Sequence, residues 1–307
     1  MNFIRFAMFV LQLSIFLSVC SLGLQSGLAD AISLFCRPSL LFRSLLAMNV
    51  FMPLLAVVAA KMFQLHPAVK VSLVFLAVSP VPPLLFRAQR KLGGSPQYIC
   101  GLLVSAALLS IALVPLTVEL LGRIFQRDIH ITPAAVARIM AATVLLPLIL
   151  GMLIRIVAPE LAERTRSPLA GIAFIALLAS GAVFLVASFP AVAALVGDGS
   201  VLAIALFVVA GITIGHLMGG PEPADRTALA LATASRHPAL ALAIGSANFP
   251  GQGQRVAAAI LLYMLVKALA LIPYNLWQKH RLSVSHTRGD TETKLFPPQI
   301  RNIKSGV

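Results

Sequence analysis

The chain has 307 residues, of which 59% are hydrophobic and only 11% are charged, and its formal net charge is +14. Soluble domains carry about 25% charged residues, so the composition excludes a soluble globular protein and indicates an integral membrane protein. The basic residues lie mainly in short segments between apolar stretches, which does not fit a nucleic-acid-binding patch. The three scattered cysteines, Cys20, Cys36 and Cys100, fit neither a disulfide framework nor a metal cluster.

Nine apolar stretches of roughly 20 residues, the length that crosses a bilayer, recur along the chain. Helices are expected because lipid offers no water to unpaired backbone groups, and the short alternating segments of a barrel are missing from the sequence. Residues 1–280 are therefore predicted to form one membrane domain, and the polar residues 281–307 a disordered cytoplasmic tail. The predicted helices cover residues 3–24, 40–64, 69–91, 96–121, 133–157, 167–189, 199–219, 226–248 and 253–278.

The distribution of lysine and arginine predicts the orientation of these helices. With the N-terminus placed outside, about twice as many basic residues lie on the inside as on the outside, which the positive-inside rule favours. Tyr274 and Trp277, at the end of the last stretch, fit an interfacial aromatic belt. We therefore expect a multi-pass protein of the inner membrane with a cytoplasmic C-terminus.

Two of the nine stretches are interrupted by proline. Pro80, Pro82 and Pro83 lie near the middle of the third stretch, and Pro238 lies near the middle of the eighth. Each proline removes a backbone donor and clashes with the preceding turn, so both helices should unwind there. Interrupted helices in corresponding positions are the best sequence indication of a transporter binding site. The breaks are five helices apart, which predicts an inverted-topology repeat that lacks the first of ten helices.

Two cationic side chains lie near the middles of predicted helices, Arg236 in the eighth and Lys267 in the ninth. A central cation costs roughly 2.5–3.5 kcal/mol on insertion scales. None of the ten carboxylates lies in the middle of a stretch, so the expected counter-ion is an anionic substrate, which an arginine binds in bidentate fashion. The alternative is that both side chains cap half-helix carbonyls or snorkel to the interface. His237 suits proton linkage, or else a structural hydrogen bond at the break.

Several motifs, in order and spacing, resemble the bile acid:sodium symporter family. They are LFCRPSLLFRSLLAMNVFMP from Leu34, LLPLILGMLI from Leu145, GHLMG from Gly215 and PALALAIGSANFP from Pro238. The resemblance spans nearly all of residues 8–278, and some relatives also lack the first of ten helices. It implies an all-α fold with a panel domain (the first, fifth and sixth stretches) and a core domain in which two broken helices cross. It also implies a secondary transporter that carries small organic anions by alternating access, with the substrate between the two domains.

The residues that hold sodium in the resembling family are replaced in this sequence. Of the family's Pro-Gly-Gly-Thr-x-Ser-Asn pattern only Pro80 remains, and Leu85 and Phe86 replace the Ser-Asn pair. A glutamate and a glutamine of the second broken helix correspond to Ala232 and Arg236. Hydrophobic side chains cannot coordinate a hard cation that requires oxygen ligands. The resemblance implies Na⁺, but these replacements favour the hypothesis that sodium coupling is lost, and we expect no metal site and no cofactor.

The second break and its neighbours are the expected substrate site. Arg236 would supply permanently the positive charge that sodium supplies in the resembling family. A further family glutamine falls at Met48, beside Asn49. The expected partners are a small anion and the lipid bilayer, and the sequence does not define an oligomeric state. The residues expected to contact the substrate are Asn49, Thr233, Ser235, Arg236, His237 and Lys267.

Two other functions remain open. A metalloid or auxin-type carrier of a related inverted-repeat fold is the nearest alternative, although arsenite carriers use a cysteine in a broken helix and Cys100 lies on the unbroken fourth stretch. A non-transporting membrane sensor is the other, and it would show no substrate counterflow. An intramembrane enzyme is not expected, because the sequence has no Gly-x-Ser-x-Gly elbow, no His-Glu-x-x-His motif and no membrane-embedded aspartate pair.

Overall fold

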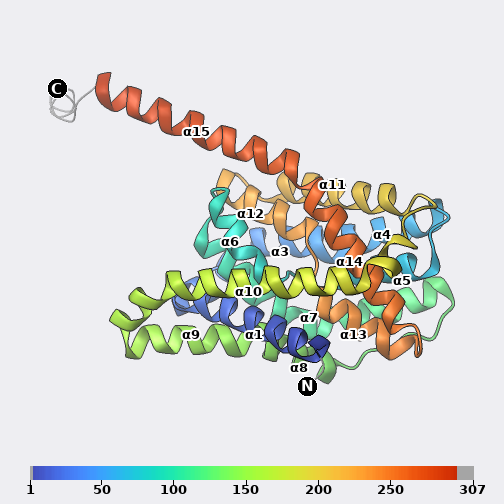
Figure 1. Ribbon diagram of the computed structural model, residues 1–307. Coiled ribbons are helices and arrows are strands. Elements are labelled where there is room, and N and C mark those ends of the chain that lie inside the picture. The colour runs from blue at the N-terminus through green and yellow to red at the C-terminus, as the bar shows by residue number, and fades with distance from the viewer. Residues whose placement is uncertain (1–2, 296–307) are drawn as a thin grey trace.

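The computed structural model of the protein describes residues 3–295, and every regular element in that range is helical, which confirms the all-α fold (Figure 1). Seven helices are long and apolar enough to cross a membrane, or eight if one bent pair counts as a single span. The pair α12 and α13, which covers the eighth predicted stretch, is not among them, so the number nine stays a prediction. The elements are α1 Phe3–Gly23, α2 Leu28–Ile32, α3 Pro38–Leu46, η1 Ala47–Phe51, α4 Met52–Met62, α5 Pro67–Val78, η2 Pro83–Leu85, α6 Phe86–Lys91, α7 Pro96–Phe125, α8 Pro133–Met140, η3 Ala141–Leu145, α9 Leu146–Val157, α10 Pro159–Ala193, α11 Ser200–Met218, α12 Pro223–Ala234, α13 Pro238–Asn248, α14 Gly253–Ala270 and α15 Ile272–Leu295.

Proline determines where many of these helices begin. It is the first residue of α3, α5, α7, α8, α10, α12 and α13, a position where the backbone N–H that proline lacks has no partner within the helix. Ser95 and Thr132 precede two of these prolines and accept hydrogen bonds from the backbone N–H groups of Tyr98 and Ala135. Such N-caps satisfy donors that the first turn leaves free. The boundaries therefore follow from local sequence, before any packing.

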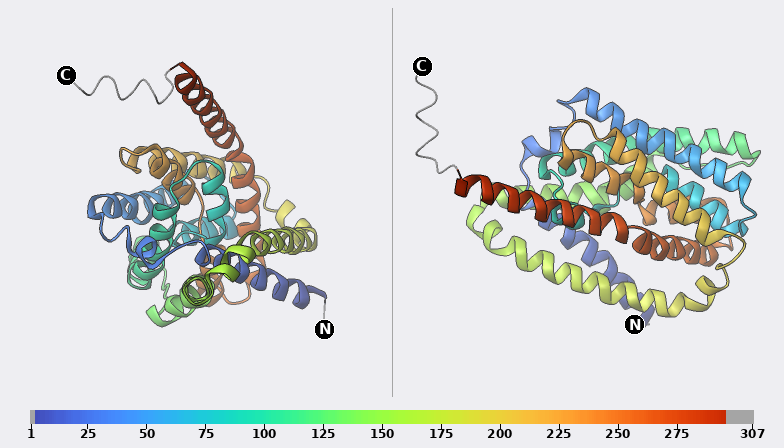
Figure 2. Two further views of the ribbon diagram at one scale, coloured as in Figure 1. Left: turned by 90° about the vertical axis from the view of Figure 1, so that its left-hand side faces the viewer. Right: turned by 90° about the horizontal axis from the view of Figure 1, so that it is seen from above.

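The helices α1, α9 and α10 pack against one another and form one layer of the molecule (Figures 1 and 2). Gly23 of α1 and Gly151 of α9 lie at the contact. A Cβ atom on Gly23 would lie 2.3 Å from the carbonyl oxygen of Leu148, and one on Gly151 would lie 2.2 Å from that of Cys20. Small residues allow such close approach of membrane helices. The three helices lie in the stretches predicted for the panel, and their movement as a unit stays a prediction.

The second layer contains the two broken pairs and the helices around them. The break-flanking helices α5 and α13 pack on each other and on α14, and α12 packs along α11. A Cβ atom on Gly215 of α11 would lie 2.6 Å from the Cα of Ala230 on α12, so the GHLMG motif serves close helix packing. This layer holds both breaks at the centre of one continuous apolar core.

The C-terminal helix extends further than the sequence indicates. α15 continues to Leu295 and projects from the helical body (Figure 1), so the described part of the predicted disordered tail is helical, and residues 296–307 lie outside the described range. The helix starts on a fixed base, because Gln278 donates to the Thr227 hydroxyl at 3.0 Å and to the Tyr274 hydroxyl at 2.9 Å. Adding turns to a formed helix avoids the nucleation cost, which lets polar residues continue it.

Candidate functional site

The first break lies between α5 and α6. The backbone leaves the helix at Ser79, which is extended, and resumes a helical turn at Pro83. The two helical parts are bent by 74°. The proline ring lacks a backbone donor, so residues 79–82 cannot continue the hydrogen-bond ladder of α5. The structure thus places an unwound segment where Pro80, Pro82 and Pro83 predict it.

The second break lies between α12 and α13. Ser235 and His237 are extended, and Pro238 begins the next helix. The backbone N–H of His237 donates to the carbonyl oxygen of Pro80 at 3.0 Å. The two breaks are therefore in direct contact. The side chain of Arg236 forms a second bond between them, to Ser79, which lies 157 positions earlier in the chain. We call residues 79–82 and 235–237 together the crossing.

Arg236 joins three segments at the crossing. Its side chain is buried, with 1% of its surface exposed. Nη1 donates to the carbonyl oxygen of Ser79 at 3.2 Å, and Nη2 donates to that of Met48 at 3.1 Å. Met48 lies in the π-helical turn η1, and a π turn interrupts the regular α-helical ladder. The guanidinium group thus links the second break to the end of α5 and to η1.

The charge of Arg236 is met by carbonyl oxygens. Among the described residues no carboxylate pairs with it. Ser79 ends α5, where the helix dipole presents its negative end. Two charge-assisted hydrogen bonds contribute about 1.5–3 kcal/mol each, enough to offset the insertion cost of one central cation. The Nε atom has no partner in the described part of the chain. The geometry therefore corresponds to the capping alternative, and a substrate contact of Arg236 stays a prediction.

His237 uses both ring nitrogens. Nδ1 accepts from the backbone N–H of Leu240, which caps the first turn of α13, at 3.4 Å. Nε2 lies 3.3 Å from the hydroxyl oxygen of Thr143, and that hydroxyl donates to the carbonyl oxygen of Ile139. The neutral tautomer with the proton on Nε2 satisfies all these groups at once, a protonation assigned from the network. In this conformation the imidazole is a structural link between the crossing and η3.

Lys267 lies close to the crossing without entering it. Its Nζ is 5.8 Å from the ring centroid of Tyr263, one turn earlier on α14. The Tyr263 hydroxyl donates to the carbonyl oxygen of Ala234 at 2.8 Å and so caps the end of α12. The lysine thus contacts the crossing through an aromatic ring.

The remaining predicted contacts lie beside the crossing. Thr233 is buried, and its hydroxyl donates to the carbonyl oxygen of Leu229 within α12. Ser235 is buried, and its hydroxyl has no partner among the described residues. Asn49 lies half-buried in η1, the turn whose Met48 carbonyl accepts from Arg236. The structure therefore places the residues predicted around the second break at or beside the crossing. Lys267 is connected to it only through Tyr263.

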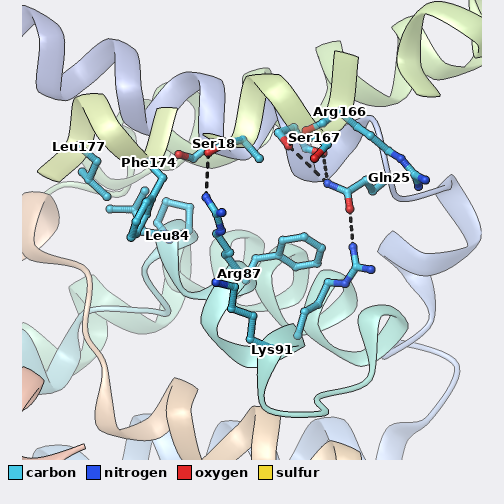
Figure 3. Close-up of a pocket in the computed structure, with 14 residues that line it drawn as sticks. Ser18, Gln25, Leu84, Arg87, Lys91, Arg166, Ser167, Phe174 and Leu177 are labelled. Carbon is cyan, nitrogen blue, oxygen red and sulfur yellow. Dashed lines mark hydrogen bonds between the residues drawn. The ribbon is translucent and has the colours of Figure 1, made fainter. Parts of the chain in front are cut away.

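A basic cavity of about 470 Å³ lies between α6 and the layer of α1 and α10 (Figure 3). Arg87 donates to the carbonyl oxygen of Ala170 at 3.2 Å, and Arg90 donates to the side-chain oxygen of Gln25. None of the predicted substrate-contacting residues lines this cavity. Its lining residues are Ser18, Ser21, Gln25, Pro83, Leu84, Phe86, Arg87, Arg90, Lys91, Arg166, Ser167, Ala170, Phe174 and Leu177.

Sequence reasoning missed this basic cavity because its cations were interpreted only as topology signals. A signal was present: Arg87, Arg90 and Lys91 are spaced i, i+3 and i+4 directly after a proline break, and so share one face of a helix. The carbonyl acceptors of Met48 and Ser79 carry no sequence signal, since any residue offers a backbone oxygen. Around the sites no three His, Cys, Asp or Glu side chains gather within the described residues as they would at a metal ion.

Comparison with known proteins identifies the family of the chain. Residues 12–195 match the model of the Sodium Bile acid symporter family, which is more than half of the chain and includes the first break. No curated protein matches the chain. The second break, with Arg236, lies outside the matched residues. The match and the several apolar membrane-length helices identify a multi-pass membrane transporter, and the chain belongs to the sodium bile acid symporter family.

Proposed function

We propose that the protein carries small organic anions by alternating access and that this transport is not coupled to sodium. It would lie in the inner membrane with its N-terminus outside and its C-terminus in the cytoplasm. The observation that carries the proposal is the position of Arg236, a fixed cation bonded to two segments at the crossing of the broken helices. Its charge is permanent at any physiological pH, so it cannot follow an ion gradient.

The residues around the crossing do not fit a sodium ion. A hard cation requires several oxygen ligands. By resemblance, the ligand positions are filled by Leu85, Phe86 and Ala232, none of which has a side-chain oxygen. The carbonyl oxygens of Met48 and Ser79 already accept from the guanidinium group, which would also repel a second positive charge. Both points support exchange or facilitated transport.

Proton coupling through His237 is less well supported than exchange. Protonation of Nδ1 would remove the acceptor for the backbone N–H of Leu240, and Nε2 already faces Thr143. A buried, hydrogen-bonded neutral imidazole loses a cap on becoming charged. We therefore propose exchange or facilitated transport of the anion rather than proton-coupled transport.

The uptake of an anion in different salts tests the proposal. A thermal-shift screen of small carboxylates and sulfonates on the purified protein would select a binding anion, which is then radiolabelled. Counterflow of that anion into proteoliposomes loaded with the unlabelled compound should proceed equally in sodium, potassium and choline salts. Strict dependence on a sodium gradient would overturn the loss of coupling. Binding without any counterflow would instead favour the membrane sensor.

A further inference from the structure

The basic cavity carries positive charge that no carboxylate among the described residues balances. Among its lining residues there is no aspartate or glutamate. Arg166 pairs with Glu163 of the same helix, so its charge is matched. Arg87 and Arg90 each donate to a neutral acceptor, and Lys91 has no hydrogen bond or ion pair with any described residue. Three cations from α6 therefore face the space between the layers without a counter-charge in the described part of the chain.

The cationic side of α6 is held rigidly. Gln89 lies between the arginines in sequence but on the opposite face, where it is buried and donates to the carbonyl oxygen of Ala228 at 2.7 Å. That bond fixes α6 to the middle of α12, the helix that precedes the second break. Residues three and four apart share a helix face, so Arg87, Arg90 and Lys91 project together away from the Gln89 anchor. Arg87 belongs to the core layer and reaches toward α10 (Figure 3), and Arg90 reaches Gln25, just after α1.

One end of the cavity is apolar. Leu84, Phe174 and Leu177 line it, and the guanidinium carbon of Arg87 lies 4.7 Å from the centroid of the Phe174 ring. A site with convergent polar groups at one end and apolar walls at the other binds amphipathic small molecules. Arginine stacked on an aromatic ring is favourably placed to receive both an anionic group and a ring that continues the stack.

We propose that this cavity binds an organic dianion: a compound with two negative charges at one end, as in a phosphate monoester, and an apolar body at the other. The inference rests on the proposed function and names its substrate class. A single negative charge would leave two of the three α6 cations unbalanced, whereas a dianion would leave only one. Planar arginine groups bind phosphate oxygens in bidentate fashion, and lysine adds a point charge.

The bound dianion would also lie between the two layers. Arg87 and Arg90 now donate to Ala170 of α10 and to Gln25 in the turn that follows α1. A phosphate group that takes over these donors replaces two neutral contacts between the layers by its own charge-assisted bonds, which are stronger. Binding would therefore change how readily the two layers separate, and such a separation is the movement that alternating access requires.

A matched pair of probes tests the charge requirement. Phenyl phosphate and benzenesulfonate share the ring, but at pH ~8 the phosphate monoester carries two charges and the sulfonate one. We expect the purified full-length protein to bind phenyl phosphate at least ~10-fold more tightly, since its second negative charge strengthens the charge-assisted hydrogen bonds from the α6 cations. Equal affinity for both probes would overturn the proposal.

Variants locate the selectivity. Arg87→Gln and Arg90→Gln should each bring the two affinities to within about threefold, since either change removes a charge-assisted bond. Both side chains are exposed, so folding should survive. Arg164→Gln removes an exposed arginine of α10 that does not line the cavity and should leave the selectivity unchanged. Selectivity that persists in both α6 variants would place the dianion elsewhere and refute the assignment.

The dianion could come from a lipid headgroup or from a soluble compound, and competition distinguishes them. Displacement of phenyl phosphate by a short-chain phosphatidic acid, at lower concentration than by inorganic phosphate, would assign a headgroup, and the reverse order a soluble phosphate compound. Both orders support the site. Counterflow separates this inference from the proposed function: transport of a monoanion without phenyl phosphate binding would overturn the site alone, and binding without counterflow would overturn the carrier alone.

Discussion

The crossing of the broken helices and the basic cavity both contain arginine, but the burial of the side chain and the acceptors of its hydrogen bonds differ between the two. At the crossing, Arg236 is buried and donates to two fixed carbonyl oxygens. In the cavity, Arg87 and Arg90 are exposed and donate to neutral groups across the space between two layers. A buried cation with fixed acceptors stabilises the structure, whereas an exposed one with replaceable acceptors can exchange its partner for a ligand.

This contrast changes the role expected for Arg236. The sequence suggests an anion contact because no carboxylate is near, but the structure supplies carbonyl oxygens as the partners. A substrate would have to take the guanidinium from Met48 and Ser79 before it could bind there. Changing one arginine at a time, and then changing the salt concentration, tests whether the two arginine environments differ in this way.

The largest effect is expected at Arg236. Arg236→Met keeps the length of the side chain but leaves the carbonyl oxygens of Met48 and Ser79 buried without a donor. Unsatisfied buried acceptors cost about 1–3 kcal/mol each, so the free energy of unfolding should fall by about 3 kcal/mol. Thermal unfolding of the detergent-solubilised protein measures this. Arg236→Lys should be milder because it keeps the charge.

Arg164→Met provides the control for this change, because Arg164 is exposed near the start of α10. Its melting temperature should stay close to that of the unchanged protein, as is usual for surface substitutions. If both methionine variants melt alike, Arg236 does not hold the crossing together, and the contrast with the cavity fails.

The breaks could be predicted from the sequence, whereas the bonds that hold them could not. Proline is written in the sequence, and its effect on a helix is local, so Pro80 and Pro238 locate both unwound segments. The partner of Arg236 is the backbone oxygen of Met48, 188 positions away, in a π turn that has no residue signature. A backbone acceptor is the same in every residue, so only the fold identifies it.

The cavity shows a different limit of sequence reasoning. Arg87, Arg90 and Lys91 also satisfy the positive-inside rule, which explains them without any site. Only the structure shows that α10 lies beside α6, with the Phe174 ring against Arg87, so that these cations line a cavity. The helical part of the C-terminal segment was missed for a related reason, since a polar sequence does not reveal that a preceding helix has already nucleated it.

The salt concentration should affect the two regions differently, and this effect is the next largest. The affinity of the cavity for phenyl phosphate should fall about fivefold between ~0.05 and ~0.5 M potassium chloride, because exposed charges are screened over a Debye length. The stability difference between the unchanged protein and Arg236→Met should hardly change over the same range, because a buried group is screened little. Calorimetric titration and thermal unfolding measure the two quantities. Equal salt dependence would mean that the two arginine environments do not differ as described.

A smaller effect is expected from the neighbour of His237. Thr143→Val removes the hydroxyl that faces Nε2 and should lower the free energy of unfolding by about 1 kcal/mol. Thr165→Val is the matched control: both hydroxyls donate to the carbonyl four residues earlier, but Thr165 has no second side-chain partner among the described residues. The melting temperatures of the two variants decide the point, and similar losses would show that the contact with His237 contributes nothing.

The smallest effect concerns an ion pair outside the apolar spans. Asp225, in the first turn of α12, is buried and lies 3.0 Å from Arg37, which is about half exposed. Burial raises the pKa of the Asp225 carboxyl above its ordinary value, although the arginine opposes the shift. The folded protein therefore holds this proton more tightly, so the group stabilises the fold at pH below its ordinary pKa. That contribution is lost as the pH rises through the folded pKa.

Asp225→Asn should remove this pH dependence at a cost below about 1 kcal/mol in the free energy of unfolding near neutral pH, since the released Arg37 remains in contact with water. Melting temperatures of both proteins across the acidic range, with Glu160→Gln in the first turn of α10 as an exposed control, measure the difference. Parallel pH profiles for the Asp225→Asn variant and the unchanged protein would mean that the ion pair fully compensates burial, so that this carboxylate, like Arg236, has its charge satisfied within the fold.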